Sequence, residues 1–252
     1  MNNTSTEKVA LITGAAHRIG ASIATTLHSS GYRVLIHYRG SAEAAQQLAD
    51  QLNQLRADSA HCLQADLDQP SAIQAMAKVA IEHWGRVDTL INNASSFYPT
   101  PIGTASDDDW NALLNSNVKG AFFLSQALAD ELKKNAGSIC NIVDIHAQKP
   151  LKQHTIYCIA KAGLAAMTQS LAKELAPQVR VNGVSPGAIL WPEAQGQDSL
   201  SAEQKATIIE QIPLQRSGEA EDIARTVFFL TTQAPYISGQ ILSVDGGRSL
   251  SM

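Results

Sequence analysis

The sequence has few of the residues that mark secreted, metal-binding or nucleic-acid-binding proteins. Three of its 252 residues are cysteines (Cys62, Cys140 and Cys158), and none forms a CxxC pair. We therefore expect reduced thiols and a cytoplasmic protein. The seven histidines lack metal-ligand spacing, which predicts no metal site. The formal net charge of -4 gives no electrostatic basis for binding nucleic acid.

Long hydrophobic runs are also missing. No stretch approaches the ~20 apolar residues that a membrane helix needs. The N-terminal residues MNNTSTEK show no cationic-then-apolar signal pattern. We therefore expect no membrane segment. A hydrophobic fraction of 44% and a charged fraction of 17% are typical of a globular chain, and 252 residues are an ordinary length for one α/β domain.

Short apolar runs alternate with helical patterns along the whole chain. The expected strands are residues 8–13, 33–38, 61–66, 87–94, 138–144, 179–185 and 240–247. The expected helices begin near residue 18 and then cover about 42–56, 70–84, 107–134, 152–176, 201–211 and 219–231. Continuous apolar strands between helices predict a parallel α/β sheet with helices on both faces. No linker divides the chain, so we predict one domain.

The first strand leads into a helix through the glycine-containing loop TGAAHRIG, residues 13–20. Gly14 and Gly20 permit a tight turn there, and the backbone N–H groups at the helix N-terminus can hold a phosphate. The plain alternative is a simple βα turn.

After the second strand, Arg39 and Ser41 stand where NAD-binding folds carry an acidic residue for the ribose. An arginine suits a 2′-phosphate, so this pattern favours NADPH over NADH, although a solvated arginine is the alternative.

Two later strands also end in polar residues. Asp66 follows the third strand and suits either an adenine amino group or the cap of the next helix. The fourth strand ends in NNASSFYPTP, residues 92–101. Ligands bind at the carboxyl ends of the strands in open α/β sheets. Phe97 and Tyr98 are therefore candidates for stacking on a flat ring, or else they anchor the loop.

The stretch 141–161 carries the candidate chemistry. Asp144 ends the fifth strand, and Tyr157 and Lys161 follow at i,i+4 spacing, which places them on one helix face. A lysine beside a phenol favours the phenolate and makes the tyrosine a better proton relay. For Asp144, the structural alternative is a cap at the strand end.

Taken together, these motifs resemble the short-chain dehydrogenase/reductase family. The resemblance rests on TGxxxRxG at 13–20, NNA at 92–94, Asn117 in NVKG, the Tyr157–Lys161 pair and the dipeptide at 186–187, all in the expected order. It implies a single Rossmann-type reductase domain over residues 1–252, with a doubly wound sheet of about seven strands. It also implies a substrate loop at about 187–212.

Within that family, most members carry serine where this chain has Asp144. That aspartate, the arginine-containing glycine loop, residues 37–41, NNASSFYPTP and VDGGRSL at 244–250 resemble the pteridine reductases. Dihydromonapterin reductases are the neighbouring group. The resemblance implies NADPH-dependent reduction of a pterin by hydride transfer to a ring carbon of a C=N bond, with dihydropterins as the main substrates and oxidised pterins and dihydrofolate as further ones. Reducing C=N needs a proton for nitrogen, which an enclosed carboxyl group can help to supply.

The resemblance also assigns roles to residues. The catalytic group would be Asp144, Tyr157, Lys161 and Asn117, the last supporting a water relay to Lys161. The NADPH site would comprise Gly14, Arg18, Ile19, Gly20, Tyr38, Arg39, Ser41, Asp66, Leu67, Asn93, Ala94, Pro186 and Gly187. The pterin would stack on Phe97 and contact Arg18, Ser95, Asp144 and Tyr157, with Trp191 as a further wall. A homotetramer is implied, with the helices at 107–134 and 152–176 as its dimer faces.

Two other functions stay open. The chain is alternatively a short-chain reductase for a ketone or an oxoacyl thioester, but such an enzyme would be expected to prefer serine at position 144. A non-catalytic NADP-sensing protein is the less favoured alternative. Such sensors commonly lose the tyrosine or the lysine, and this chain keeps both Tyr157 and Lys161.

Overall fold

One parallel sheet organises the structure, a computed structural model that describes residues 7–189 and 201–252. Its strand order is β3-β2-β1-β4-β5-β6-β7. The seven strands are β1 (Val9–Ile12), β2 (Arg33–Tyr38), β3 (Ala60–Gln64), β4 (Thr89–Asn92), β5 (Ser138–Ile142), β6 (Arg180–Pro186) and β7 (Ile241–Val244). The order reverses between β1 and β4, which is the switch point of a doubly wound fold. The predicted α/β fold class is confirmed.

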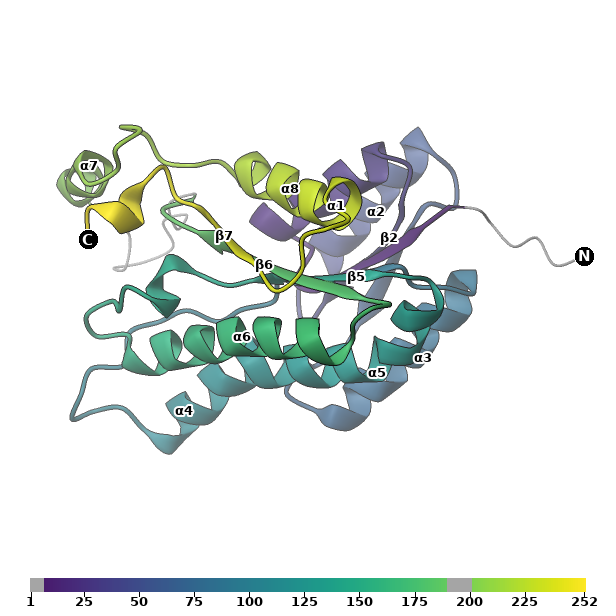
Figure 1. Cartoon of the computed structure of the whole chain (residues 1–252), viewed down its shortest axis with the longest axis horizontal. Helices are drawn as coiled ribbons and strands as arrows, with labels where there is room; N and C mark the ends of the chain where they lie inside the picture. Colours follow the sequence, from purple (N-terminus) through teal and green to yellow (C-terminus); the bar gives the residue numbers. More distant parts are fainter. Residues whose placement is uncertain (1–6, 190–200) are drawn as a thin grey trace, which may run out of the picture.

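Helices cover both faces of this sheet (Figure 1). One face carries α1 (Arg18–Ser29), α2 (Ala42–Leu55) and α8 (Ala220–Phe228). The other carries α3 (Pro70–Trp84), α4 (Asp107–Leu114), α5 (Gly120–Lys134) and α6 (Thr155–Glu174). A further helix, α7 (Ala202–Glu210), lies beside the C-terminus in Figure 1. None of the helices in the described ranges is long and apolar enough to cross a membrane.

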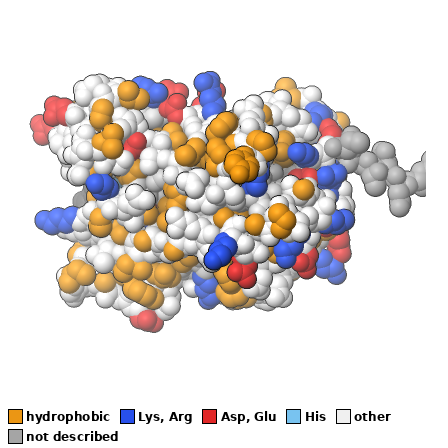
Figure 2. Space-filling model, in the orientation of Figure 1, with side chains coloured by type: hydrophobic (Ala, Val, Ile, Leu, Met, Phe, Trp, Pro, Cys, Tyr) orange, Lys and Arg blue, Asp and Glu red, His pale blue; other side chains and the backbone are white. Residues whose placement is uncertain are grey.

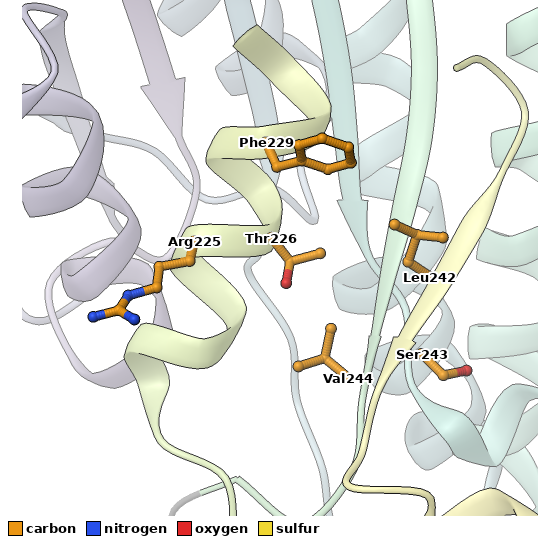
Figure 3. Close-up of a pocket in the computed structure, with 6 residues that line it drawn as sticks. All are labelled: Arg225, Thr226, Phe229, Leu242, Ser243 and Val244. Atoms are coloured by element: carbon orange, nitrogen blue, oxygen red, sulfur yellow. The ribbon is translucent and has the colours of Figure 1, made fainter. Parts of the chain in front are cut away.

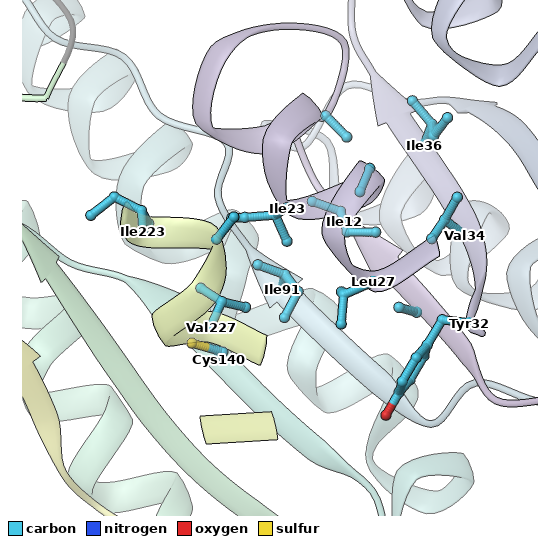
Figure 4. Packing of buried hydrophobic residues seen from close by; sticks show 14 of the residues in the cluster. Ile12, Ile23, Leu27, Tyr32, Val34, Ile36, Ile91, Cys140, Ile223 and Val227 are labelled. Carbon is cyan, nitrogen blue, oxygen red and sulfur yellow. The ribbon is translucent and has the colours of Figure 1, made fainter. Parts of the chain in front are cut away.

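The strands are apolar on both sides because each side faces helices. Along β1, Ala10 and Ile12 pack toward α1 and α8, while Val9 and Leu11 pack toward α3 and α5. Successive side chains of a strand point to opposite faces, so a sheet covered twice needs hydrophobic residues at every position. Figure 4 shows the first of these cores, where side chains of α1 and α8 meet those of the central strands.

Two predicted helices differ in detail. The expected helix at 107–134 is interrupted by a π-turn, Asn115–Lys119, in which the Gly120 N–H donates to the Asn115 carbonyl. The expected helix at 152–176 begins only at Thr155, because Gln153 adopts a left-handed φ of +66° that a helix cannot contain. Neither feature shows in hydrophobic periodicity, because both depend on contacts with other parts of the chain.

The last two predicted elements end early. α8 stops at Phe228 and continues as a second π-turn, Phe229–Gln233. β7 ends at Val244, because Gly246 and Gly247 have φ values of +63° and +85° and turn the chain away from the sheet. A one-turn 3-10 helix, Arg248–Leu250, follows.

Candidate active site

The carboxyl ends of the central strands bring the predicted residues to one edge of the sheet. The glycine loop follows β1, residues 93–97 follow β4, Asp144 follows β5, and Pro186 closes β6. These strands are neighbours in the sheet, so loops from four distant parts of the sequence meet there.

Asp144 and Tyr157 form the centre of the site. The Tyr157 hydroxyl donates to Asp144 Oδ2 over 2.8 Å. The other carboxylate oxygen, Oδ1, accepts the backbone N–H of His146 over 2.8 Å and so caps the 3-10 helix Ile145–Ala147. The cap and the chemical interpretation of Asp144 are therefore compatible, because each uses a different oxygen.

The Tyr157 phenol does not become a phenolate in this arrangement. Burial, which is the largest cause, and the negative charge of Asp144 together raise the pKa of Tyr157 well above its ordinary value. The expectation that Lys161 would favour the phenolate was therefore wrong. Lys161 Nζ lies 5.7 Å from the centre of the Tyr157 ring, whereas the Asp144 carboxylate touches the hydroxyl directly. The proton therefore stays on the Tyr157 oxygen.

Lys161 is a buried cation on the same face of α6 as Tyr157. Its side chain is 2% exposed, and Nζ donates to the Ile142 carbonyl over 2.9 Å. Burial lowers the pKa of Lys161 to about 8, and the negative charge of Asp144 offsets part of that effect. The ammonium therefore sits close to its titration midpoint at the upper end of the physiological range.

This shift makes folding stability depend on pH. A lysine whose pKa is about 8 in the folded protein, against 10.5 when unfolded, binds fewer protons folded than unfolded between those values. The cost of burying its charge is therefore present below pH 8 and is relieved as pH rises toward 10. We expect the free energy of unfolding of the wild type to rise relative to Lys161→Met across this window, by about 3 kcal/mol. Urea titrations of both proteins at several pH values measure the difference, and parallel pH curves would contradict it.

Asn117 lies in the π-turn and is held by several hydrogen bonds. Its Nδ2 donates to the carbonyls of Ser96, over 2.9 Å, and Leu113, over 3.0 Å. Its Oδ1 accepts from the Ser95 hydroxyl over 2.7 Å. Both ends of the amide thus fasten the loop that follows β4. The predicted relay role toward Lys161 stays a prediction.

The aromatic loop after β4 lies against the catalytic tyrosine. The centre of the Phe97 ring is 4.8 Å from that of Tyr157 in an edge-to-face contact, and 4.6 Å from that of His154 in a stacked contact. Phe97 is nevertheless 53% exposed. An exposed ring held against the ring of Tyr157 is a suitable surface for a flat heteroaromatic substrate.

The glycine loop is held against the end of β4 by Thr13 and Asn93. Thr13 Oγ1 accepts the N–H groups of Asn93 and Ala94 over 2.9 and 3.0 Å, and Asn93 Nδ2 donates to the carbonyls of Thr13 and Gly14. A Cβ atom at Gly20 would lie 2.4 Å from the Gly14 carbonyl oxygen. The loop therefore packs so closely that only glycine fits at position 20.

The N-terminus of α1 fits a phosphate-bearing cofactor. Its N-cap, His17, makes no side-chain cap bond, and its first turn holds no acidic residue. Arg18 is exposed and has a left-handed φ of +52°, and Ile19 packs against the core behind it. Open backbone N–H groups beside a cationic side chain suit a pyrophosphate.

The predicted adenosine-binding residues gather at the ends of β2 and β3. Tyr38 packs against the core, Ser41 stands at the N-cap of α2, and the Arg39 guanidinium lies 3.7 Å from Asp68. Asp66 Oδ1 accepts the Asp68 N–H over 3.0 Å within the turn before α3. The N-cap of α3 is Gln69, so the interpretation of Asp66 as the cap of that helix was wrong. Leu67 is buried, with its carbonyl against Gly120 at the start of α5.

At the end of β6, Pro186 pairs with Val244. The Gly187 N–H donates to the Val244 carbonyl over 3.0 Å. A Cβ at Gly187 would lie 2.6 Å from Asp245 Cβ, so this glycine also permits a close approach. Trp191 and the rest of residues 190–200 in the predicted substrate loop lie outside the described residues.

Comparison with known proteins agrees with this geometry. A family model described as enoyl-(acyl carrier protein) reductase matches residues 14–249. The chain belongs to the short-chain dehydrogenase/reductase family. Pteridine reductase 1 of Leishmania tarentolae is 38% identical over 292 aligned positions, which cover 100% of this chain and 99% of that protein. The 3-oxoacyl-[acyl-carrier-protein] reductases FabG of Staphylococcus aureus and Staphylococcus epidermidis are 35% and 34% identical over 95% of this chain, covering 97% and 98% of those proteins.

Membership of the short-chain dehydrogenase/reductase family makes this protein an oxidoreductase that uses a nicotinamide cofactor. The residues present fit such a cofactor, because the closely packed Gly20 and the open N-terminus of α1 form a cradle for its phosphates. When bound, the cofactor supplies the hydride.

Three side chains at this site of the short-chain reductase were given no role by the sequence patterns: His37, Thr13 and His154. Burial lowers the pKa of His37 to about 4, so its neutral ring accepts the Gly14 N–H at Nδ1 and donates from Nε2 to the Ala65 carbonyl. Thr13 and His154 were missed as well. The sequence shows that Thr13 precedes Gly14 and that His154 stands three residues before Tyr157. It does not show the contacts that their side chains make.

A hollow elsewhere on the reductase lies outside this site. It is bounded by α8 and β7 and lined by Arg225, Thr226, Phe229, Leu242, Ser243 and Val244 (Figure 3). None of these residues belongs to the catalytic group. A ligand there would not meet Asp144 or Tyr157.

Proposed function

We propose that the protein is an NADPH-dependent pteridine reductase. It would convert dihydropterins to tetrahydropterins and would also accept oxidised pterins and dihydrofolate. The observation that carries the proposal is the Asp144 carboxylate, which holds the Tyr157 hydroxyl at 2.8 Å where most members of the family have serine. The 38% identity to pteridine reductase 1 of Leishmania tarentolae over the whole chain supports it.

The charge of Asp144 suits a C=N substrate better than a carbonyl. A carbonyl that accepts hydride develops negative charge on oxygen, which a neighbouring carboxylate would repel. A ring nitrogen that takes up a proton gains positive charge, which the same carboxylate stabilises. The preference follows from the sign of the charge that develops beside Asp144.

The protein's own groups then handle the proton. Tyr157 holds it on the phenol oxygen, and Asp144 orients that hydroxyl. Transfer to the substrate nitrogen leaves negative charge on the pair, which the Lys161 ammonium, 5.7 Å from the Tyr157 ring, helps to balance. Phe97 provides the surface against which the substrate ring stacks, and Ser95 lies at its polar edge.

For the cofactor, we propose that Arg39 selects NADPH. Its guanidinium is exposed and only 3.7 Å from Asp68, a pairing that a 2′-phosphate can replace. We expect Arg39→Ala to weaken NADPH binding by about tenfold or more and to leave NADH nearly unchanged. Fluorescence titration with both cofactors measures the ratio. Equal losses for NADH and NADPH would refute the assignment to the 2′-phosphate.

The direct test of the function is a substrate screen at fixed NADPH concentration. Purified protein should oxidise NADPH in the presence of dihydrobiopterin, followed at 340 nm. No turnover with any pterin or folate would end the proposal.

The alternative is reduction of an oxoacyl thioester, and the FabG relatives at 35% and 34% identity favour it. The same screen should therefore include an acetoacetyl thioester. Turnover of the thioester without turnover of pterins would decide for this alternative.

We also propose a homotetramer with dimer faces on α4, α5 and α6. Trp110, Phe122 and Ile159 are exposed apolar residues on these three helices. Hydrophobic side chains appear over α4 and α6 on the face in Figure 2, among charges of both signs. Light scattering of the purified protein would give the mass, and a monomer would refute the proposal.

A further inference from the structure

The C-terminal turn places an unpaired arginine close to the active site. Arg248 begins the 3-10 helix that follows Gly246 and Gly247. Its side chain is half-buried, and its Nε is fully buried without a hydrogen-bond partner. Within residues 7–189 and 201–252, no side chain forms an ion pair with this guanidinium. The buried Nε has lost water without gaining a partner among the described residues, an arrangement that costs free energy and suggests that a ligand completes it.

Two carboxylates near Arg248 are already occupied. Asp245 Oδ1 and Oδ2 accept the N–H groups of Gly247 and Ser249 over 2.9 and 2.8 Å, and the Asp144 oxygens accept from His146 and Tyr157. Burial lowers the pKa of Arg248, and the charges of Asp144 and Asp245 partly offset this effect. The guanidinium therefore lies within electrostatic reach of Asp144, but its buried Nε has no hydrogen-bond partner in the part of the chain that the structure describes.

The turn fixes where this arginine stands. Its first residue, Asp245, packs directly on Gly187, where a Cβ would come within 2.6 Å of Asp245 Cβ. On the other side, Gly246 and Gly247 pack against Ile212 and Pro213. Arg248 follows this turn directly, so it begins beside the end of β6, where the nicotinamide is expected, and its charge acts on Asp144, where the substrate is expected to take up its proton.

We propose that Arg248 is a substrate-specificity residue whose guanidinium binds a carboxylate carried by the substrate, on a ring substituent where the substrate is a pterin. The planar fork of arginine matches a carboxylate with two parallel hydrogen bonds. A monoanion is favoured over a phosphate dianion, because Asp144 and Asp245 repel the second negative charge. The identity of the ring rests on the proposed function, but the carboxylate preference does not.

The test compares binding of matched ligands to the NADP⁺-loaded enzyme by calorimetry. One pair is pterin-6-carboxylate and 6-hydroxymethylpterin, and the other is 3-oxohexanoate and its methyl ester. We expect the wild type to prefer the acid in at least one pair, and Arg248→Leu to lose about 10- to 100-fold of that preference. Arg248→Lys should keep part of it. The control Arg225→Leu, which removes an exposed arginine paired with Glu221 on α8, should keep all of it.

The outcomes separate the two proposals. Turnover of pterins with NADPH, measured independently, decides the proposed function. An acid preference that appears only on the oxoacyl pair would support the role of Arg248 while the pteridine reductase proposal fails. Equal preference in wild type and Arg248→Leu, or no preference in the wild type on either pair, would overturn the role of Arg248. A change of mass by light scattering with unchanged preference would also overturn it and would assign Arg248 to a contact between copies.

Discussion

Asp144→Ser should reduce kcat for pterin reduction by about 100-fold or more, the range expected when a proton-transfer group is lost. The substitution removes the acceptor that orients the Tyr157 hydroxyl and the negative charge that favours protonation of the substrate nitrogen. Removing that charge also removes one cause of the raised pKa of Tyr157. Stopped-flow measurement of NADPH oxidation under single-turnover conditions would report the chemical step itself.

The fold should survive this change, because a serine hydroxyl can replace Asp144 as the cap of the helix Ile145–Ala147. Thermal unfolding and NADPH titration should therefore match the wild type within small differences. Asp144→Asn is the matched variant, since it keeps the shape and the cap but loses the charge. If Asp144→Ser turned over pterins at the wild-type rate, the carboxylate would have no part in the mechanism.

Gly20→Ala should abolish cofactor binding at ordinary NADPH concentrations. The added methyl would lie 2.4 Å from the Gly14 carbonyl oxygen, 2.7 Å from Asn93 Nδ2 and 2.8 Å from Ala15 Cα, so the glycine loop must move. Forced overpacking costs about 1–3 kcal/mol of stability. The loop bonds from Asn93 and Thr13 would break as it moves. Denaturant titration and NADPH fluorescence titration measure the two effects.

Gly163→Ala is the control of opposite sign. Gly163 lies inside α6, and its added methyl would meet only Val118 Cγ2, at an ordinary 3.7 Å. Alanine in a helix interior should stabilise the protein by about 0.5–1 kcal/mol and should leave NADPH binding intact. Normal NADPH affinity in Gly20→Ala would show that the loop tolerates the shift and is not the cofactor cradle.

The sequence was informative wherever local pattern decides structure. Each expected strand overlaps an observed one, because a sheet covered on both faces requires unbroken apolar runs such as Val9–Ile12. β3 begins one residue before the expected range 61–66, and β6 ends one residue after the expected range 179–185. The spacing of Tyr157 and Lys161 placed them on one helix face, and the resemblance to the pteridine reductases singled out Asp144. The structure brings these three side chains together.

The remaining details depend on contacts between distant residues. The pKa of Tyr157 was expected to be lowered, but it is raised. Sequence spacing showed the lysine on the same helix, but it did not show the carboxylate that touches the hydroxyl. The unpaired state of Arg248 was likewise hidden, although its motif was recognised. The neighbouring Asp245 does not pair with Arg248, because both of its carboxylate oxygens accept backbone N–H groups of its own turn.

The π-turn at Asn115–Lys119 has a consequence for how this chain can vary in length. A π-turn holds one residue more than the α-helical turn that would replace it, while the helices on either side keep their orientation. A deletion of one residue there would restore an unbroken helix, with α5 still presenting Leu124 and Leu128 to the same core. Such a shortened chain would fold, yet Asn117 would lose the backbone position from which it holds the loop after β4. A single-residue gap in this stretch would therefore mark relatives that keep the architecture but have altered chemistry.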